Sequence, residues 1–492
     1  MIRFFFLYCI FIMLLFPQPK QKEIIGLQKP TELKAPQVNS AALNLERVIR
    51  SVEQFYPIIL AGEQLLSAAE YDYLAAQGAF DLQFRSLNQT TPLGFYQNAA
   101  SDNVFDKPTP IAGTSFFAGY RMGRGNFPSY DGKRATNEYG EVRVGAVVPL
   151  LRNRDTDKNR TDLKKSEMDK KLAELNLQKL KIEVIRVATQ RYWKWVSTGQ
   201  EYKVMKGLLE IAEKRVEQVK ERVRLGDLPS IEITENDRVI LQREAQLVIA
   251  ERELQKASID LSLFWRGETG AMIRPDESQL PSALPVPMIL ENMNVDSLLK
   301  KALDVRPDLR EYAYKKEKFK LDMELAQNNL KPQVDLVVVG SQNMGPGSVT
   351  RTPTQVEANV VLNIPIQTRR QRGQIGSAQS QISKLEQEET FQRDKIKTEI
   401  QDSLSDMEAL RKRVIVAEKE VKLARKLEEL ERDRFNLGDS TLLIVNIREQ
   451  TAAEAAIREV RSLGDFQNSL ANFRAVMAEK AVYPEDQAKN PN

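Results

Sequence analysis

Two long stretches of the chain have apolar residues at helical spacing and very few helix breakers. The first extends from about residue 155 to residue 225, and the second from about residue 372 to residue 437. In the first, the apolar positions are three to five residues apart and are flanked by Glu, Lys and Arg: Val204, Leu208, Ile211, Val216, Val219 and Val223. This narrow seam predicts helices of the coiled-coil type. At about 1.5 Å per residue, a helix of about 70 residues is roughly 100 Å long.

Each long stretch ends in the same short motif. Arg-x-x-Leu-Gly-Asp occurs at residues 222–227 and again at residues 434–439. Gly at this place predicts a helix stop, because it accepts the left-handed conformation. Ser230 is then expected to cap the next helix in the first copy, and Asp439, Ser440 or Thr441 in the second. The chain should therefore contain two long antiparallel helical hairpins with tips at residues 225–230 and 437–441.

Four shorter segments alternate between apolar and polar residues, which predicts strands with one polar face. They cover residues 79–87, 141–150, 333–339 and 355–365. Residues 88–137, between the first two, are rich in Gly, Pro, Asn and Thr and are expected to form a long loop region, within which residues 113–120 also fit a strand segment. Phe116, Phe117 and Tyr120 fit either an aromatic girdle at a membrane surface or packing within the loops.

The order of elements divides the chain into two repeats. Residues 41–267 are expected to give a helix, a strand, a loop, a strand and a long hairpin, and residues 291–479 repeat that order. A Gly- and Pro-rich linker is predicted at residues 268–290. Arg3 and the apolar run after it predict a signal peptide over residues 1–19, with a buried apolar helix as the alternative. Residues 20–40 are predicted to be an extended linker, and residues 480–492 a disordered tail.

Composition narrows the function classes. Charged residues make up 28% of the chain and aromatic residues 7%, which is typical of long solvated helices. The net charge is only +4 with interspersed signs, so we expect no nucleic-acid partner. The sequence has no His, and Cys9 is its single Cys. We therefore expect neither a metal site nor a cofactor, and no enzyme, although catalysis by carboxylates alone stays open.

An exported chain with four amphipathic strands indicates a membrane β-barrel. Four strands are too few, because the smallest barrels have about 8, and an open edge in lipid leaves backbone groups unpaired. Three chains would supply about 12 strands in all. The charged helices must then project into water. The predicted fold class is thus mainly α, with duplicated helical hairpins and four strands per chain that contribute to a trimeric 12-stranded barrel.

These features together resemble a known family. The duplicated hairpin, Arg306-Pro307-Asp308-Leu309 at a helix start, Lys331-Pro332 at a strand start and the Phe435–Thr441 tip are similar to those of TolC-like outer membrane efflux proteins. The resemblance covers residues 41–480 and implies a homotrimer in the outer membrane, with its helices in the periplasm. It implies a passive, gated duct without enzymatic activity, in a tripartite efflux or type I secretion system. Its partners would be a periplasmic adaptor protein, an inner-membrane pump and outer-membrane lipid.

The resemblance also implies which residues act. The two tips would contact the adaptor and narrow the pore. The corresponding positions are Leu225, Gly226, Asp227 and Leu228 in the first copy, and Leu437, Gly438, Asp439, Ser440 and Thr441 in the second. Glu232 is a candidate pore constriction, with a solvated helix carboxylate as the simpler alternative; Ile444 and Ile447 stand where the second copy would carry acids. The rival function is a periplasmic coiled-coil scaffold or adaptor without a membrane span. The cargo (drug, metal ion or polypeptide) is not encoded in these motifs.

Overall fold

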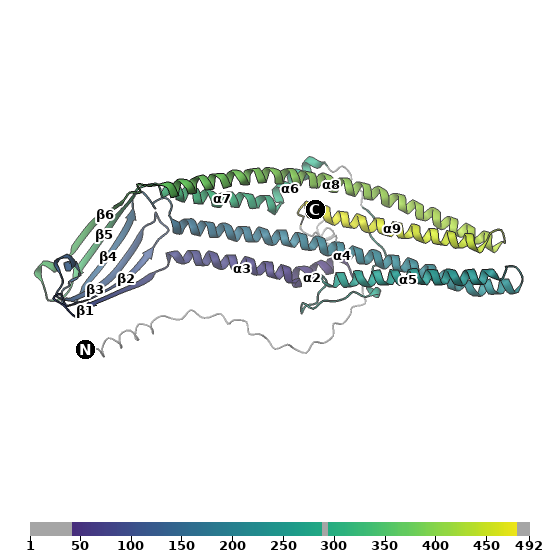
Figure 1. Cartoon of the computed structure of the whole chain (residues 1–492), viewed down its shortest axis with the longest axis horizontal. Coiled ribbons are helices and arrows are strands. Elements are labelled where there is room, and N and C mark those ends of the chain that lie inside the picture. Colours follow the sequence, from purple (N-terminus) through teal and green to yellow (C-terminus); the bar gives the residue numbers. More distant parts are fainter. Residues whose placement is uncertain (1–41, 288–293, 480–492) are drawn as a thin grey trace, which may run out of the picture. The chain divides into compact units, whose positions relative to one another are not determined.

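The computed structural model describes residues 42–287 and 294–479, which belong to one compact unit. The predicted signal peptide, the linker at 20–40 and the tail at 480–492 lie outside the described residues, as does part of the linker at 268–290. In the described part, the sheet lies at one end of the helices and the two hairpin tips lie at the other (Figure 1).

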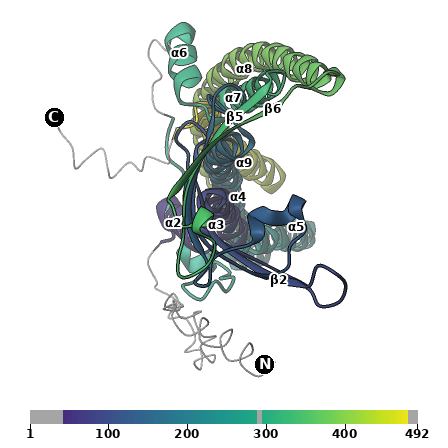
Figure 2. The same cartoon turned by 90° about the vertical axis from the view of Figure 1, so that its left-hand side faces the viewer.

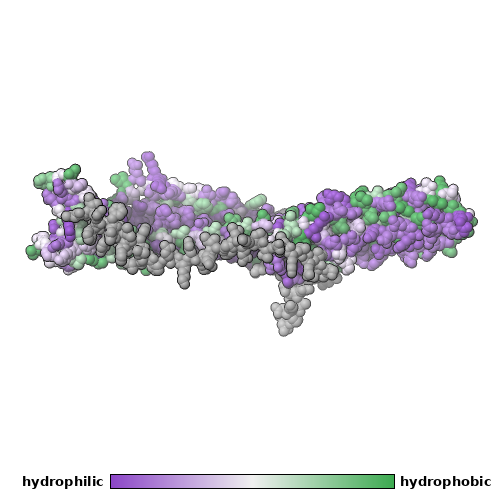
Figure 3. Space-filling model, turned by 90° about the horizontal axis from the view of Figure 1, so that it is seen from below, coloured by the Kyte–Doolittle hydropathy of each residue, from purple (hydrophilic) through white to green (hydrophobic). Residues whose placement is uncertain are grey.

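The long hairpins form as predicted. Helix α4 (Lys158–Arg224) turns into α5 (Ile231–Ser262), and α8 (Arg369–Asn436) turns into α9 (Leu442–Val476). With 67 and 68 residues, α4 and α8 are each about 100 Å long. The two hairpins pack on each other through α4 and α9, so the helices lie side by side in the order α5, α4, α9, α8. Hydrophobic patches lie among hydrophilic side chains along them (Figure 3).

Four shorter helices complete the wall near the sheet. Helix α2 (Leu45–Phe55) is followed by α3 (Pro57–Gln77), and α6 (Val295–Val305) by α7 (Pro307–Asn328). Pro57 and Pro307 each occupy the first helical turn, where the missing N–H costs nothing, and the residue before each is extended. Helix α3 packs on α4, and α7 packs between α4 and α8. Near the sheet the order is therefore α3, α4, α7, α8.

The strand count is the main correction to the sequence prediction. The structure has one antiparallel sheet of six strands in chain order. The strands are β1 (Gln83–Thr91), β2 (Asn98–Pro108), β3 (Ser115–Gly125), β4 (Glu141–Pro149), β5 (Gln333–Asn343) and β6 (Gln355–Asn363). Residues 98–125, most of which were expected to be loop, thus form a hairpin between β1 and β4. The first predicted strand also lies later than expected, because residues 78–80 form the short helix η1 (Gly78–Phe80).

From β3 to β6 the sheet largely separates apolar from polar side chains, whereas β1 and β2 add only Phe84 and Phe105 as large apolar residues on the same face. Residues opposite each other in the ladder share a face, and one face carries Phe84, Phe105, Phe116, Val144, Val338 and Val360. The opposite face carries Arg85, Asp102, Arg121, Arg143, Asp335 and Glu357. We call these the apolar face and the polar face. The sheet is curved and open, with β1 and β6 at its two edges (Figure 2).

The connection between β3 and β4 folds back over the polar face. A side-chain carbon built at Gly123 would lie 1.8 Å from the Arg134 carbonyl oxygen, so the backbones touch only because this residue is Gly. The Thr136 N–H donates to the Gly123 carbonyl at 3.2 Å, and Lys133 forms an ion pair with Glu357 of β6 at 3.3 Å. Residues 126–140 are therefore held against the sheet at its end away from the helices.

Two hydrophobic cores lie in the helical part, away from the tips. One surrounds Trp195 of α4, which is 1% exposed, and includes Tyr192, whose hydroxyl donates to the Leu43 carbonyl at 2.9 Å. The other surrounds Ile396, Ile400 and Met407 of α8 and Phe466 of α9. These cores fasten the short helices of each repeat to its long hairpin. Among the described residues, none of the helices combines the length and apolar character needed to cross a membrane.

Candidate functional site at the paired hairpin tips

The two tips have the same backbone geometry. Gly226 and Gly438 both have φ of +85°, a conformation that residues with a side chain rarely adopt. In the first tip, the Gly226 N–H donates to the Val223 carbonyl at 3.1 Å and the Asp227 N–H to the Arg222 carbonyl at 2.9 Å. The second tip repeats both bonds. This is the Schellman motif, so the predicted Gly helix stop is confirmed in both copies.

The helix restarts differ between the copies. Thr441 caps α9, because its hydroxyl accepts from the Ile444 N–H at 3.5 Å. Ser230 is the residue before α5, but its side chain makes no capping hydrogen bond within the described structure. The position of this cap was predicted correctly, but the expected capping hydrogen bond is not formed. Ser230 has helical φ and ψ, whereas a capping residue is normally extended.

The tips are exposed at their ends and packed together behind them. Leu225 is 59% exposed and Leu437 is 79% exposed. Behind them, a cluster shared by both hairpins holds the tips together: Val219, Val223, Leu228, Ile233, Phe435, Leu442 and Val445. Arg222 donates to the Phe435 carbonyl at 3.3 Å, and its guanidinium lies 4.8 Å from the centre of the Phe435 ring. The structure therefore presents both tips as one joint end on which Leu225 and Leu437 are exposed.

Leu228 and Ser440 are the less exposed of the predicted contact residues, and Ser440 donates a hydrogen bond to Glu431 at 2.6 Å. Leu228 is only partly exposed because it packs on the shared cluster, whereas Gly226, Asp227, Gly438 and Asp439 are exposed. Glu232 is half-buried at the start of α5, and its carboxylate has no hydrogen-bond or ion-pair partner within residues 42–287 and 294–479. Ile444 is 39% exposed at the corresponding place in α9. The predicted inequality of the copies is thus present in the structure, and the role of Glu232 stays a prediction.

A buried charge cluster between the hairpins was missed by sequence reasoning. The Glu449 carboxylate of α9 is fully buried and is contacted by Arg215 of α4 and Arg243 of α5. Arg243 donates to Glu449 at 2.9 Å and to the Leu208 carbonyl at 2.7 Å. Arg215 also donates to Asn446 at 2.8 Å. Burial lowers the pKa of the Arg215 guanidinium, against the effect of the Glu449 carboxylate beside it.

This cluster ties the two hairpins together at about 15 Å from the tips, as ten helical residues separate Arg215 from Leu225. In the sequence, the cluster could have been recognised from charged residues at positions of the apolar seam. Glu449 follows Leu442 and Val445 and precedes Ala452 at heptad spacing, and Arg215 stands between Ala212 and Val219 in the same way. A charge at such a position has to find its partner on another helix, which the local pattern does not identify.

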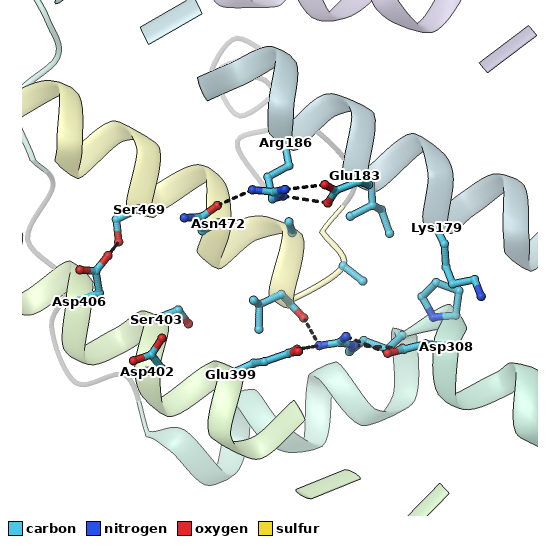
Figure 4. Close-up of a pocket in the computed structure, with 16 residues that line it drawn as sticks. Lys179, Glu183, Arg186, Asp308, Glu399, Asp402, Ser403, Asp406, Ser469 and Asn472 are labelled. Atoms are coloured by element: carbon cyan, nitrogen blue, oxygen red, sulfur yellow. Dashed lines mark hydrogen bonds and ion pairs between the residues drawn. The ribbon is translucent and has the colours of Figure 1, made fainter. Parts of the chain in front are cut away.

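The pocket in Figure 4 lies elsewhere, where α4, α8 and α9 meet the start of α7. It has a volume of about 470 Å³, and its lining combines apolar residues with several paired charges. Arg306 donates to Glu399 at 2.7 Å and to Asp308 at 2.8 Å. Burial would raise the pKa of Asp308, but the bonds from Arg306 outweigh it and hold the pKa below its usual value. The Arg306-Pro307-Asp308 motif thus fastens α7 to α8, and its charges are used in that joint.

Comparison with known proteins agrees with this architecture. Residues 298–479 match the family model described as outer membrane efflux protein. No curated protein matches the chain in sequence. Several solved outer-membrane channels share its fold at low sequence identity. VceC of Vibrio cholerae is 15% identical, and the match covers 88% of this chain and 96% of VceC with a TM-score of 0.61.

Two further channels match over nearly the whole chain. CmeC of Campylobacter jejuni is 12% identical, and the match covers 93% of this chain and 97% of CmeC with a TM-score of 0.60. MtrE of Neisseria gonorrhoeae is also 12% identical, with 91% of this chain and 93% of MtrE covered and a TM-score of 0.60. At these identities the likeness concerns the fold.

The second half of the chain therefore carries an outer membrane efflux protein domain, and the described chain has the fold of these channels. The predicted resemblance and the predicted mainly helical fold with a small antiparallel sheet are confirmed. The family that the model describes is one of the outer membrane, in agreement with the predicted location.

Proposed function

We propose that this chain is the outer-membrane channel of a tripartite efflux or type I secretion system, a passive gated duct that works as a homotrimer. The observation that carries the proposal is the placement of two kinds of surface at opposite ends. A curved sheet with an apolar face lies at one end, and two exposed, duplicated tips lie at the other.

The sheet supports a membrane location. All six strands have 9 or 11 residues, which is the length of a strand that crosses a bilayer at a tilt. On the apolar face Phe84 is 52% exposed, Phe116 54% and Val360 66%. Such a face in water would be an aggregation hazard, and in lipid it is the normal outer surface of a barrel.

Unpaired edges of the sheet and of the helical wall support a ring of identical chains. Within the described residues, β1 and β6 each pair on one side only. The edge helices also carry exposed apolar seams. On α5 these include Ile231, Leu241 and Val248, and on α8 Val416, Leu423 and Leu430. Because an open edge cannot persist in lipid, the β6 and α8 side of one copy would join the β1 and α5 side of the next. Three copies are the number that the family resemblance implies.

The exposed tips indicate where partner proteins would bind. An adaptor protein would dock on the exposed leucines of the joint end, and an inner-membrane pump behind it would supply energy and select the cargo. The chain itself offers the duct, with no catalytic role. The rival function, a periplasmic scaffold without a membrane span, leaves the apolar face of the sheet unexplained.

Cell fractionation tests the proposal. The chain should be found in the outer-membrane fraction as a trimer that resists detergent and dissociates on heating. Release as a soluble monomer by osmotic shock would contradict the proposal and favour the periplasmic scaffold.

The Glu232 prediction needs the assembled trimer in a planar bilayer. If Glu232 lines the narrow end of the pore, three carboxylates there favour cations. Glu232→Gln should then lower the preference for K⁺ over Cl⁻ by about 2-fold or more, because the ring loses its charge. Glu235→Gln, next to it on α5 and paired with Arg238, is the matched control. An unchanged preference in Glu232→Gln would remove this residue from the constriction.

A further inference from the structure

We propose that the hairpin of β2 and β3 is part of the barrel wall, so that three copies close an eighteen-stranded barrel and not a twelve-stranded one. The inference rests on the proposed function, because it takes the outer-membrane trimer as given. The inference adds a prediction of the pore width and of which strands are neighbours in the closed ring.

The hairpin is an insertion in the first repeat. In the second repeat, α7 leads into β5, and β6 leads directly into α8. In the first repeat, α3 leads into β1 and β4 leads into α4, so β1 and β4 correspond to β5 and β6. Strands β2 and β3 have no counterpart among the described residues of the second repeat. They lie between β1 and β4, with a continuous antiparallel register on both sides.

Strand β3 has the two faces that a barrel wall needs. Strand β2 has them in part, because on the apolar face it carries Phe105 together with Ser101, Asn103 and Lys107. Phe105 of β2 and Phe116 of β3 lie on the apolar face and are 45% and 54% exposed. The neighbouring rings of Phe84 and Phe105, with centroids 4.9 Å apart, continue this face from β1 onto β2. Each inserted strand has 11 residues, long enough to cross the bilayer.

Charges on the polar face fasten the insertion to the rest of the sheet. Arg121 of β3 donates to Glu141 of β4 at 2.9 Å, and this carboxylate is almost fully buried. Arg143 of β4 reaches across β3 to form an ion pair with Asp102 of β2. It passes over Gly119, which is opposite Arg143 in the ladder and has no side chain to block it. The polar face of β2 is thus locked to β4, on the side that would face the lumen.

The ring closes with the correct strand directions. An even number of alternating strands per copy means that β6 of one copy is antiparallel to β1 of the next. Three sheets of six strands give eighteen in all. At about 4.8 Å between strands and a tilt of about 40°, eighteen strands have a circumference of about 110 Å, and twelve have about 75 Å.

The helical wall fits the wider barrel. Near the sheet, each copy contributes four helices side by side, α3, α4, α7 and α8. Twelve such helices at about 8–10 Å spacing form a ring of roughly 96–120 Å. Eighteen strands therefore continue the helical ring with little change in width. Barrels of about 16–18 strands leave an aqueous channel, so the cargo class that this end admits includes bulky solutes and polypeptide segments.

The first experiment locates the two faces of β2 in the assembled trimer. Single cysteines are placed in a Cys9→Ser background at Phe105, at its neighbour Asp106 on the polar face, and at Val144 of β4 as the reference for the wall. Each is labelled with a fluorophore, and the trimer is reconstituted in vesicles of brominated phosphatidylcholine. Labels at Phe105→Cys and Val144→Cys should be quenched to within about 2-fold of each other, and the label at Asp106→Cys several-fold less.

The outcomes separate the two proposals. Quenching at Val144→Cys without quenching at Phe105→Cys overturns the wider barrel and leaves the channel intact. Absence of quenching at both positions overturns the membrane location itself, and the wider barrel with it.

A second experiment tests which strand lies beside β1. Phe84 is opposite Phe105 in the sheet, and Val144 lies in the same row two strands further on. In the assembled trimer, oxidation should join the cysteine pair at Phe84 and Phe105 but not the pair at Phe84 and Val144. A twelve-stranded barrel without the insertion would put β1 beside β4. A disulfide in the second pair, or none in the first, would therefore overturn the inference.

Discussion

We expect Gly226→Pro and Gly438→Pro each to abolish export while the trimer still assembles. Both glycines have φ of +85°, and proline holds φ at about −65°. Proline also removes the N–H that donates to the Val223 or the Phe435 carbonyl. The tip must then take another shape, and the exposed leucine before each glycine moves with it. The hydrophobic cores and the sheet lie far from the tips, so assembly should continue.

Two measurements check this result. One is cross-linking of a tip cysteine to the adaptor that co-purifies with the unsubstituted chain. The other is the sensitivity of the cells to a panel of dyes, antibiotics and metal salts. Asn tolerates the left-handed conformation, so Gly226→Asn and Gly438→Asn are the matched controls and should retain most of the function. Normal cross-linking in both proline variants would reject docking at the tips.

The second large effect is expected at the buried charge cluster between the hairpins. Glu449→Ala leaves Arg215 and Arg243 buried without their carboxylate. Removal of one partner from such a cluster costs about 3–5 kcal/mol. The hairpins should therefore separate more easily near the tips, and protease should cleave the ends of α5 and α9 at lower temperature than in the unsubstituted trimer.

Glu454→Ala is the matched control on the same helix. Its carboxylate is 51% exposed and lies 4.0 Å from Arg458. Exposed pairs of this kind contribute about 0–1 kcal/mol, so little change is expected. Equal protease sensitivity of the two alanine variants would show that Glu449 does not hold the hairpins together. Glu449→Gln should fall between them, because the amide oxygen can still accept one of the hydrogen bonds.

The features that the sequence predicted correctly depend on neighbouring residues. The long helices follow from a seam that repeats along one chain segment, and Gly226 and Gly438 end them by their own backbone freedom. Pro57 and Pro307 start α3 and α7 for a similarly local reason. Strands β4, β5 and β6 were found because apolar residues alternate along each of them.

The missed features depend on partners far along the chain. Strand β2 carries Ser101 and Asn103 on its apolar side, so the alternation there is broken, although its ladder with β3 is continuous. The Ser86 hydroxyl donates a hydrogen bond to the Asn103 side-chain oxygen across the strands at 2.7 Å, which the local sequence does not reveal. In the charge cluster, Arg215 and Asn446 are separated by 231 residues. Glu232 was identified as a candidate from the tip motif alone. Glu449 could be identified only from the structure, in which the two hairpins lie together.

If the wider barrel forms, the segment at residues 126–140 would act as its permeability barrier. It lies against the polar face at the end away from the helices, with Gly123 beneath it and Lys133 paired with Glu357. In a closed ring this face is the lumen, so three copies of the segment would stand across the outer mouth. A pore of this width would otherwise admit bulky solutes from outside the cell. The strands would then set the size of the largest cargo that can leave the cell, and the segment at residues 126–140 would limit what can enter it.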